Sequence, residues 1–436
     1  MALIILVTII LSAAAAAYFL YPRLGIVSGF AAKNLCSAFY LAGRDGRSVA
    51  AGENAIFPVR YARAVIMPEA RAASASVFGL GRRTAVYTEG AGCLLLPEDL
   101  AGNPPPHYAP TRRRFQPPAA RPPESPAPGA AGLELEEAVA AAFDGAGKWR
   151  NRTAAVVVLR GGRIVAERYA PGFGPGTRLA GWSMTKSLTA AVCGVLAGEG
   201  RLDLERRGLF GEWMDGRARI TVNQLLQMSS GLAWAEDYTS DGDVTGMLYR
   251  AADMGAVQRG KPLAAEPGTK WNYSSGTTNL LSAFLRGLFA SHQEYLDFWY
   301  EGLADRIGMD SLVLETDRSG TYVGSSYGWA TAADWAKLGQ LYLNKGVWGG
   351  RQVLAPGWAD YTARPAPGSG GAYGAHFWLN AGGKFPGAPA DLYYCGGYQG
   401  QYVFIVPSKD AVIVRLGLSG RHFAAAAFLK GILAAL

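Results

Sequence analysis

The feature that most constrains the fold is a proline-rich segment, residues 104–128, which holds 10 of the 24 prolines in this 436-residue chain. Proline fixes φ and lacks a backbone N–H, so such a segment forms neither a helix interior nor a central strand. We expect residues 104–130 to be a linker or an extended strap over a surface. The segment divides the chain into a shorter N-terminal part and a longer C-terminal part.

The first residues contain a long uncharged run. Residues 2–21 carry no charged side chain, and 20 residues are about what a helix needs to cross a bilayer. We therefore expect residues 1–22 to be a transmembrane anchor. A signal peptide is the alternative, because the alanines at 13–17 would suit a cleavage site.

Residues 23–103 are expected to form a small β-rich N-terminal region. Residues 64–67, 76–80, 84–87 and 93–96 are short β-rich runs separated by glycine-rich turns. Cys36 and Cys93 both lie in this region. They would form a disulfide in an oxidising compartment, or they are two independent buried thiols.

Residues 131–436 have the pattern of a single α+β domain. Residues 153–159 and 163–169 form a predicted β-hairpin around Gly161-Gly162, and residues 402–406 and 411–416 form another. Most of the chain between the hairpins is helical in pattern, at 184–199, 221–229, 276–289, 293–304 and 331–345. We expect an antiparallel sheet built from both ends of the domain, flanked by the helices 133–143 and 422–436, with a mostly helical lobe beside it.

Composition excludes several classes of function. The net charge is +8, and most of the excess lies before residue 130. The larger part has no basic stripe, so we expect no nucleic-acid partner. The histidines and cysteines show no metal-ligand spacing, so we expect no metal site. The chemistry predicted below implies no organic cofactor either.

A candidate nucleophile lies at the start of the predicted helix 184–199. Ser183 and Lys186 form an S-x-x-K motif. Residues three apart share one face of a helix, so the lysine can reach the serine hydroxyl and accept its proton. An N-capping serine with a surface lysine is the structural alternative.

Two further segments contain groups suited to acyl transfer. Tyr273 precedes the predicted helix 276–289 and could share a proton with Lys186. Gly396 and Gly397 precede the strand that begins near Gln401, and the N–H groups of Gln401 and Ser183 could form an oxyanion hole. A buried structural tyrosine and a plain glycine-rich turn are the alternatives.

These three segments, in this order, resemble the S-x-x-K, Y-x-N and K-T-G motifs of the serine β-lactamase and penicillin-binding protein superfamily. Residues 220–232 (ITVNQLLQMSSGL) and 328–343 (GWATAADWAKLGQLYL) resemble runs of its class C-like branch, which includes esterases and 6-aminohexanoate-dimer hydrolases. The resemblance covers about residues 135–436. It implies a β-lactamase/transpeptidase-like fold with the active site between sheet and helical lobe.

The departures from the family pattern concern substrate binding. Ser275 replaces the asparagine of Y-x-N, and Tyr398-Gln399-Gly400 replaces Lys-Thr-Gly. The lysine and threonine of that motif hold a substrate carboxylate. The sequence therefore favours an esterase or amidase acting on small neutral substrates. The alternative is a penicillin-recognising DD-peptidase or β-lactamase, or an acylated sensor.

A rival nucleophile is Ser326, in the G-x-S-x-G match at 324–328, with Asp391 and His422 as partners. The helical stretch before it argues against an α/β-hydrolase, which needs alternating parallel strands. Ser326 and Tyr327 are instead expected to line the cleft. Trp234 and Tyr238 lie in a polar loop that could cover the cleft or be a solvated connection.

Localisation follows from two opposing arguments. Arg23 and Lys33 follow the uncharged run and would keep the rest of the chain cytoplasmic. The family that the chain resembles works mainly outside the cytoplasm. We expect an inner-membrane protein with its catalytic domain in the periplasm, and the sequence does not indicate its oligomeric state.

Overall fold

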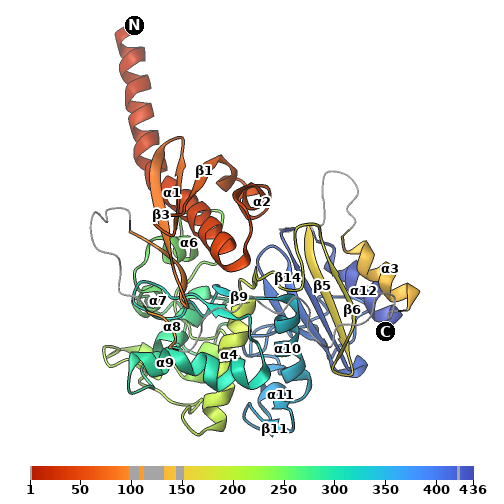
Figure 1. Cartoon of the computed structure of the whole chain (residues 1–436). Helices are drawn as coiled ribbons and strands as arrows, with labels where there is room; N and C mark the ends of the chain where they lie inside the picture. Colours follow the sequence, from red (N-terminus) through yellow and green to blue (C-terminus); the bar gives the residue numbers. More distant parts are fainter. Residues whose placement is uncertain (1, 98–107, 112–131, 144–151, 420–422) are drawn as a thin grey trace.

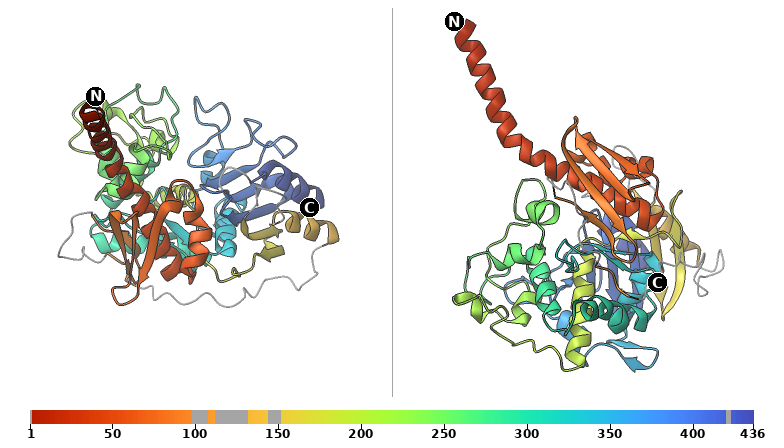
Figure 2. Two further views of the ribbon diagram at one scale, coloured as in Figure 1. Left: turned by 90° about the horizontal axis from the view of Figure 1, so that it is seen from above. Right: turned by 60° about the vertical axis from the view of Figure 1, so that its left-hand side comes forward.

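The computed structural model describes residues 2–97, 108–111, 132–143, 152–419 and 423–436. The chain begins with the 41-residue helix α1 (Ala2–Ala42), whose first half projects from the body of the protein (Figures 1 and 2). The segment Arg23–Ala42 is long and apolar enough to cross a membrane, but 78% of it is buried inside the protein. This second half of α1 is therefore a core helix of the N-terminal region.

The N-terminal region combines a core helix with a small antiparallel sheet; the strands were expected from the sequence, but the helix over residues 23–42 was not. The second half of α1 packs against an antiparallel meander of β1 (Ala62–Met67), β2 (Ala72–Val77), β3 (Leu80–Thr88) and β4 (Gly92–Leu95), and the short α2 (Gly46–Ala51) follows α1. The predicted strand at 76–80 was wrong in its bounds. Phe78 and Gly79 have φ of 51° and 82°, and they form the turn between β2 and β3.

The N-terminal region packs directly on the rest of the protein. Glu315, which is fully buried, lies between the two parts and forms an ion pair with Lys33 of α1. The same carboxylate accepts hydrogen bonds from the Cys93 N–H at 2.7 Å and from Trp329 Nε1 at 2.9 Å. Within the region, a disulfide joins Cys36 to Cys93.

The C-terminal part contains a six-stranded antiparallel sheet in the order β12-β13-β14-β15-β5-β6. Both predicted hairpins are present, with β5 (Thr153–Arg160) and β6 (Arg163–Tyr169) near one end of the chain and β14 (Gln401–Val406) and β15 (Ala411–Gly417) near the other. They meet in the middle of the sheet, where Val414 pairs with Val157 and Val403. The remaining strands are β12 (Trp378–Leu379) and β13 (Tyr393–Gly397).

Helices cover both faces of this sheet. The terminal helices α3 (Leu133–Ala141) and α12 (Ala425–Ala435) pack together on the outer face (Figure 1). On the inner face, α10 (Ala332–Leu343) lies so close that a Cβ on its Gly339 would come within 2.8 Å of Val403 and Val412. The helix α4 (Met184–Gly198) packs on the same side, in the main hydrophobic core.

The helical lobe lies between β7 and β12 in the sequence. It contains α5 (Val222–Leu226), α6 (Asp243–Arg250), α7 (Met254–Arg259), α8 (Ser275–Arg286), α9 (His292–Phe298) and α11 (Trp358–Thr362). A small sheet joins β7 (Leu179–Ala180), β9 (Gly328–Ala330) and β8 (Val313–Leu314), and β10 (Val347–Trp348) pairs with β11 (Arg351–Gln352). The predicted helix 221–229 is shorter than expected, because Met228 has a φ of 59° and ends it. The last part of the predicted helix 293–304 is a π-helical turn, over residues 299–304.

Most of the proline-rich segment lies outside the described residues. Its described part, residues 108–111, packs on α9. The Thr111 N–H donates to Asp297 Oδ1 at 2.6 Å, and Gln293 Nε2 donates to the Ala109 carbonyl at 3.0 Å. Residues 108–111 therefore lie against the helical lobe.

Candidate active site

Ser183 occupies the residue before α4, next to a strained backbone. Trp182 has a φ of 48°, a left-handed conformation that a bulky residue rarely adopts and that is typical of functional sites. The Ser183 side chain makes no capping hydrogen bond to α4, so the N-cap alternative does not hold for this helix. Its hydroxyl instead accepts a hydrogen bond from Lys186 Nζ at 3.0 Å.

Lys186 is buried on the first turn of α4, with 1% of its surface exposed. Besides Ser183, its ammonium donates to Ser275 Oγ at 2.9 Å and to the Ser325 carbonyl at 3.0 Å. Burial lowers the pKa of Lys186 to about 8, and the nearby charge of Glu236 opposes that shift. A neutral lysine is therefore accessible near physiological pH, as a general base requires.

Tyr273 lies beside the same ammonium. Lys186 Nζ is 5.0 Å from the centre of the Tyr273 ring, and Tyr373 and Trp378 pack around this ring. Burial raises the pKa of Tyr273 well above 10, the charge of Glu236 raises it further, and a hydrogen bond with Ser183 opposes both. Tyr273 is therefore protonated near neutral pH. Of the two groups, Lys186 is the one able to accept a proton.

Glu236 is a functional candidate that the sequence analysis missed. Its carboxylate accepts hydrogen bonds from Trp234 Nε1 at 2.6 Å, the Ser275 N–H at 2.8 Å and the Tyr238 hydroxyl at 3.2 Å. The Ser275 hydroxyl also donates to it. Lys186, Ser275 and Glu236 thus form a continuous hydrogen-bonded chain. The signal in the sequence was the alternation W-x-E-x-Y, which places three side chains on one side of an extended segment.

Aromatic rings connect the loop after Leu232 to the nucleophile. Tyr238 stacks on Tyr398, with ring centres 5.5 Å apart and planes 13° apart. Tyr398 in turn meets Trp182 edge to face at 5.4 Å. Tyr238, expected to line the cleft, and Tyr398, expected to bind substrate, are therefore connected by ring contacts to Trp182, the residue before Ser183. Trp234 reaches this group through its hydrogen bond to Glu236.

The segment matched to Lys-Thr-Gly is a turn between β13 and β14. Gln399 and Gly400 have φ of 62° and 81°, and the Gln399 side chain is buried. In this hairpin, Gly397 meets the segment before Ser183, because a Cβ on Gly397 would lie 2.1 Å from the Gly181 carbonyl oxygen. The Gln401 side chain accepts from the Gly417 N–H at 2.9 Å, so it faces β15.

The rival nucleophile is buried. Only 1% of the surface of Ser326 is exposed, and its hydroxyl lies 2.9 Å from Ser325 Oγ. Asp391 accepts hydrogen bonds from Ser408 on the β14–β15 turn, and His422 lies outside the described residues.

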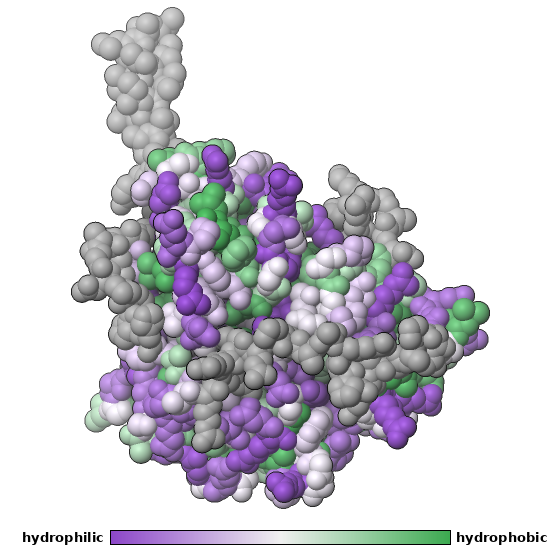
Figure 3. All heavy atoms as spheres, viewed as in Figure 1, coloured by the Kyte–Doolittle hydropathy of each residue, from purple (hydrophilic) through white to green (hydrophobic). Residues whose placement is uncertain are grey.

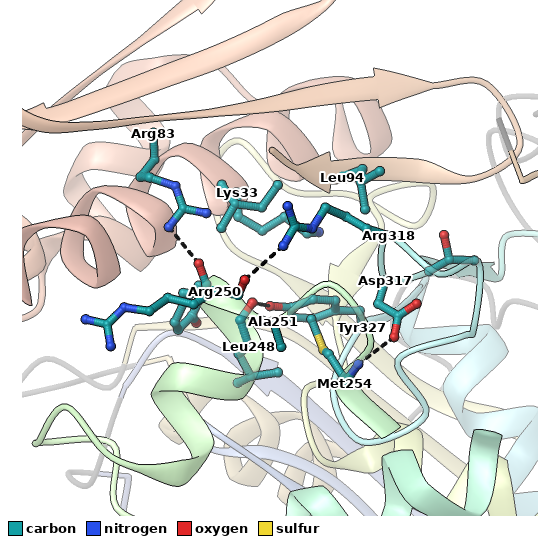
Figure 4. Close-up of a pocket in the computed structure, with 13 residues that line it drawn as sticks. Lys33, Arg83, Leu94, Leu248, Arg250, Ala251, Met254, Asp317, Arg318 and Tyr327 are labelled. Atoms are coloured by element: carbon teal, nitrogen blue, oxygen red, sulfur yellow. Dashed lines mark hydrogen bonds between the residues drawn. The ribbon is translucent and has the colours of Figure 1, made fainter. Parts of the chain in front are cut away.

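Tyr327 lies away from the nucleophile. Its hydroxyl donates to the Leu248 carbonyl at 3.2 Å, and its ring lies 4.3 Å from Lys33 Nζ. Tyr327 and Lys33 both line a pocket between the N-terminal region and the helical lobe (Figure 4). Tyr327 was expected to line the cleft, and it instead faces this pocket, which Ser183 and Lys186 do not line. Among the described residues, no group of histidine, cysteine, aspartate and glutamate side chains could hold a metal ion.

Comparisons with known proteins agree with this arrangement. Residues 138–420 match the family described as Beta-lactamase. The chain is 29% identical to 6-aminohexanoate-dimer hydrolase of Paenarthrobacter ureafaciens over 294 residues, which cover 61% of this chain and 72% of that protein.

Two solved structures share the fold at low sequence identity. A family VIII carboxylesterase has a TM-score of 0.56 at 17% identity, covering 71% of this chain and 99% of its own. A penicillin-binding protein homolog from Caulobacter crescentus has a TM-score of 0.54 at 18% identity, with the same coverage of 71% and 99%. The predicted α+β fold is confirmed.

Proposed function

Because the chain belongs to the beta-lactamase family and is a serine hydrolase, we propose that it forms its acyl-enzyme on Ser183 and acts on small esters or amides. The observation that carries this proposal is the 3.0 Å contact between Ser183 Oγ and the buried Lys186 ammonium. A serine is a weak nucleophile at neutral pH unless a positioned base takes its proton. Lys186 is such a base, because burial lowers its pKa to about 8.

The proposed reaction moves protons among Ser183, Lys186 and Tyr273. Neutral Lys186 takes the Ser183 proton as Oγ attacks the carbonyl carbon of the substrate. Protonated Tyr273 then donates to the departing alcohol or amine and recovers its proton through Lys186. Water repeats the sequence on the acyl-enzyme and releases the acid.

The oxyanion needs two backbone donors. The Ser183 N–H at the start of α4 is one, and the hairpin turn between β13 and β14 supplies the other. We assign the second donor to the Tyr398 N–H rather than to Gln401, since Gly397 is the residue that meets the Ser183 segment.

The substrate class follows from the charges in the site. Tyr398 and Gln399 cannot supply the cation and hydroxyl that hold a substrate carboxylate. The charged side chains that contact or perturb the proposed catalytic groups are Lys186 and Glu236. The substrate is therefore a neutral or cationic ester or linear amide, such as the class to which a 6-aminohexanoate dimer belongs.

Covalent labelling tests the proposal directly. The full-length protein is treated with a fluorophosphonate and digested, and the modified peptide is identified by mass spectrometry. We expect one adduct, on Ser183. An adduct on Ser326, or none under conditions where ester hydrolysis proceeds, would overturn the assignment.

Substrate preference can be altered at Tyr398. The wild-type protein should hydrolyse p-nitrophenyl acetate faster than nitrocefin, because no cation holds the lactam carboxylate. A charge-assisted hydrogen bond is worth about 1.5–3 kcal/mol, so Tyr398→Lys should raise nitrocefin turnover relative to ester turnover by about 10- to 150-fold. Tyr398→Met removes the same ring without adding charge and serves as the control. Equal ratios for the two variants would contradict this account of the turn.

Glu236 should set the pH at which the base becomes active. We expect kcat/KM for p-nitrophenyl acetate to rise with pH through a pKa of about 8, as Lys186 loses its proton. Glu236 raises the pKa of Lys186, so Glu236→Gln should move this rise to lower pH. Besides Glu236, the titratable groups coupled to Lys186 are Tyr273 and the buried His376.

The matched control for Glu236 is its neighbour Asp237. Asp237 accepts hydrogen bonds from Thr239 at 2.8 and 2.7 Å in the same loop. Asp237→Asn makes the same change in charge and should leave the pH profile where it is. If Glu236→Gln lowers the rate without moving the profile, Glu236 only supports the loop.

We further propose that residues 2–21 anchor the protein in the inner membrane, with residues 23–436 in the periplasm. The uncharged run has the required length, and the Cys36–Cys93 disulfide is typical of an oxidising compartment. The test is a reporter fused after Leu436 that is active only when exported. Activity of a cytoplasm-only reporter would reverse this topology.

A further inference from the structure

The N-terminal region carries an exposed apolar patch made of Phe57, Tyr61, Phe78 and Leu80. Phe78 and Phe57 are 82% and 73% exposed, which is unusual for large aromatic side chains. Tyr61 lies with its ring centre 6.1 Å from that of Phe57 and 6.2 Å from that of Phe78, so the three rings are contiguous. A contiguous apolar surface of this kind usually marks an interaction site.

The patch lies at the point where α1 leaves the body of the protein. The Ser28 hydroxyl donates both to the Leu24 carbonyl and to the Gly81 carbonyl. A Cβ on Gly81 would lie 2.8 Å from Leu24 Cβ, so the turn that carries Phe78 and Leu80 touches α1 at residue 24. Figure 3 shows hydrophobic surface gathered below the projecting half of the helix.

The position of residue 24 relates the patch to a bilayer surface. The uncharged run ends at Tyr21, and Arg23 is the first charged residue after it. Twenty residues of helix rise about 30 Å, the thickness of the hydrocarbon core. If residues 2–21 span that core, the polar interface of the membrane lies at residues 21–24. Because the segment that carries Phe78 and Leu80 contacts α1 at residue 24, the patch lies at the same depth as this interface.

The surroundings of the patch suit lipid headgroups. Arg60, Arg63 and Arg82 are exposed beside it, and the Arg60 guanidinium lies 5.7 and 5.1 Å from the ring centres of Phe57 and Tyr61. Aromatic rings favour the membrane interface, where one side is apolar and the other is wet. Basic side chains near the surface gain about 1 kcal/mol each from anionic lipids.

We propose that Phe57, Tyr61, Phe78 and Leu80 insert into the interfacial layer of the membrane that residues 2–21 cross, with Arg60, Arg63 and Arg82 on anionic headgroups. This proposal rests on the membrane attachment proposed above and goes beyond it. A single helix can tilt and rotate in the bilayer, and because α1 runs unbroken from residue 2 into the core, the domain would tilt and rotate with it. A second contact fixes the orientation of the domain against the bilayer.

The test places a nitroxide spin label in the patch of the full-length protein. Phe78→Cys and, separately, Phe57→Cys are labelled and reconstituted into vesicles of phosphatidylcholine and phosphatidylglycerol. The native thiols Cys193 and Cys395 are buried, and the other two cysteines form the disulfide, so the new cysteine is the one labelled. The control is Met214→Cys, because Met214 lies on the helical lobe and is 90% exposed. Molecules whose hydrolase domain faces the vesicle lumen lower the nickel accessibility of every label equally, so comparison with the label at 214 corrects for them.

Collision rates with oxygen and with a water-soluble nickel chelate then separate the outcomes. We expect labels at 78 and 57 to show several-fold lower nickel and higher oxygen accessibility than the label at 214. Nickel accessibility equal to that at 214, in protein that floats with the vesicles, overturns the patch proposal and leaves the anchor intact. Low accessibility to both probes indicates contact with a second copy and also overturns it. Protein that does not float contradicts the anchor and the patch together.

Discussion

Replacing Ser183 by alanine should reduce the hydrolysis of p-nitrophenyl acetate by at least about 10³-fold, since removing a nucleophile removes covalent catalysis as a whole. Ser183 is half-buried directly before α4, and its side chain makes no capping bond there. The variant should therefore unfold at the same urea concentration as the wild type. Steady-state kinetics and a urea titration measure both quantities.

Ser326→Ala is the matched control for this prediction. Ser326 is buried beside Ser325, whose carbonyl accepts a hydrogen bond from Lys186. Loss of its hydroxyl should change activity only slightly. If Ser326→Ala abolishes hydrolysis and Ser183→Ala does not, the active site has been assigned to the wrong serine.

Glu315→Gln should lower the free energy of unfolding by about 3–5 kcal/mol, the usual cost of breaking a buried ion pair. Glu315 is fully buried and accepts from the Lys33 ammonium, the Ser37 hydroxyl, the Cys93 N–H and the Trp329 indole. A glutamine keeps the shape but turns an NH₂ group toward one or more of these donors. Lys33 would be left buried beside a neutral partner. Urea denaturation followed by tryptophan fluorescence measures the loss.

The control for this prediction is the exposed pair Lys345–Asp360, whose side chains are 60% and 61% exposed. Asp360→Asn should change the free energy of unfolding by less than about 1 kcal/mol, because water screens the pair. Equal losses for Glu315→Gln and Asp360→Asn would show that the contact between the N-terminal region and the lobe adds nothing to stability.

Sequence patterns located the elements whose signals are local. The hairpin of β5 and β6 combines β-branched residues with Gly161-Gly162, which both adopt positive φ. The helix α4 was expected from a long, mostly apolar run without proline. Patterns were weaker where small residues dominate. In β2, alanine and serine fit a strand or a turn equally well, so the boundary at Phe78 was missed.

Long-range contacts could not be read from local patterns. Glu236 looked like one of several acids in a polar loop, and its importance depends on Ser275, 39 residues away. Ser183 and Lys186 could be paired because they lie within one helical turn. No local pattern indicated that Glu315 binds the N-terminal region, because its partners Lys33, Ser37 and Cys93 belong to no recognisable motif.

The contacts of Glu315 also determine the order in which the chain can acquire its structure. Lys33 and Glu315 are 282 residues apart, and Cys93 and Glu315 are 222 apart. The ribosome synthesises α1 and the first sheet early. Residues near 315 and 329, which pack on both of them, are synthesised much later. Until those residues emerge, the apolar face of α1 has no final cover. Contacts this distant in sequence slow folding and leave such surfaces exposed to aggregation. The N-terminal region, although small, is therefore expected to complete its packing only after residues near 315 and 329 have been made.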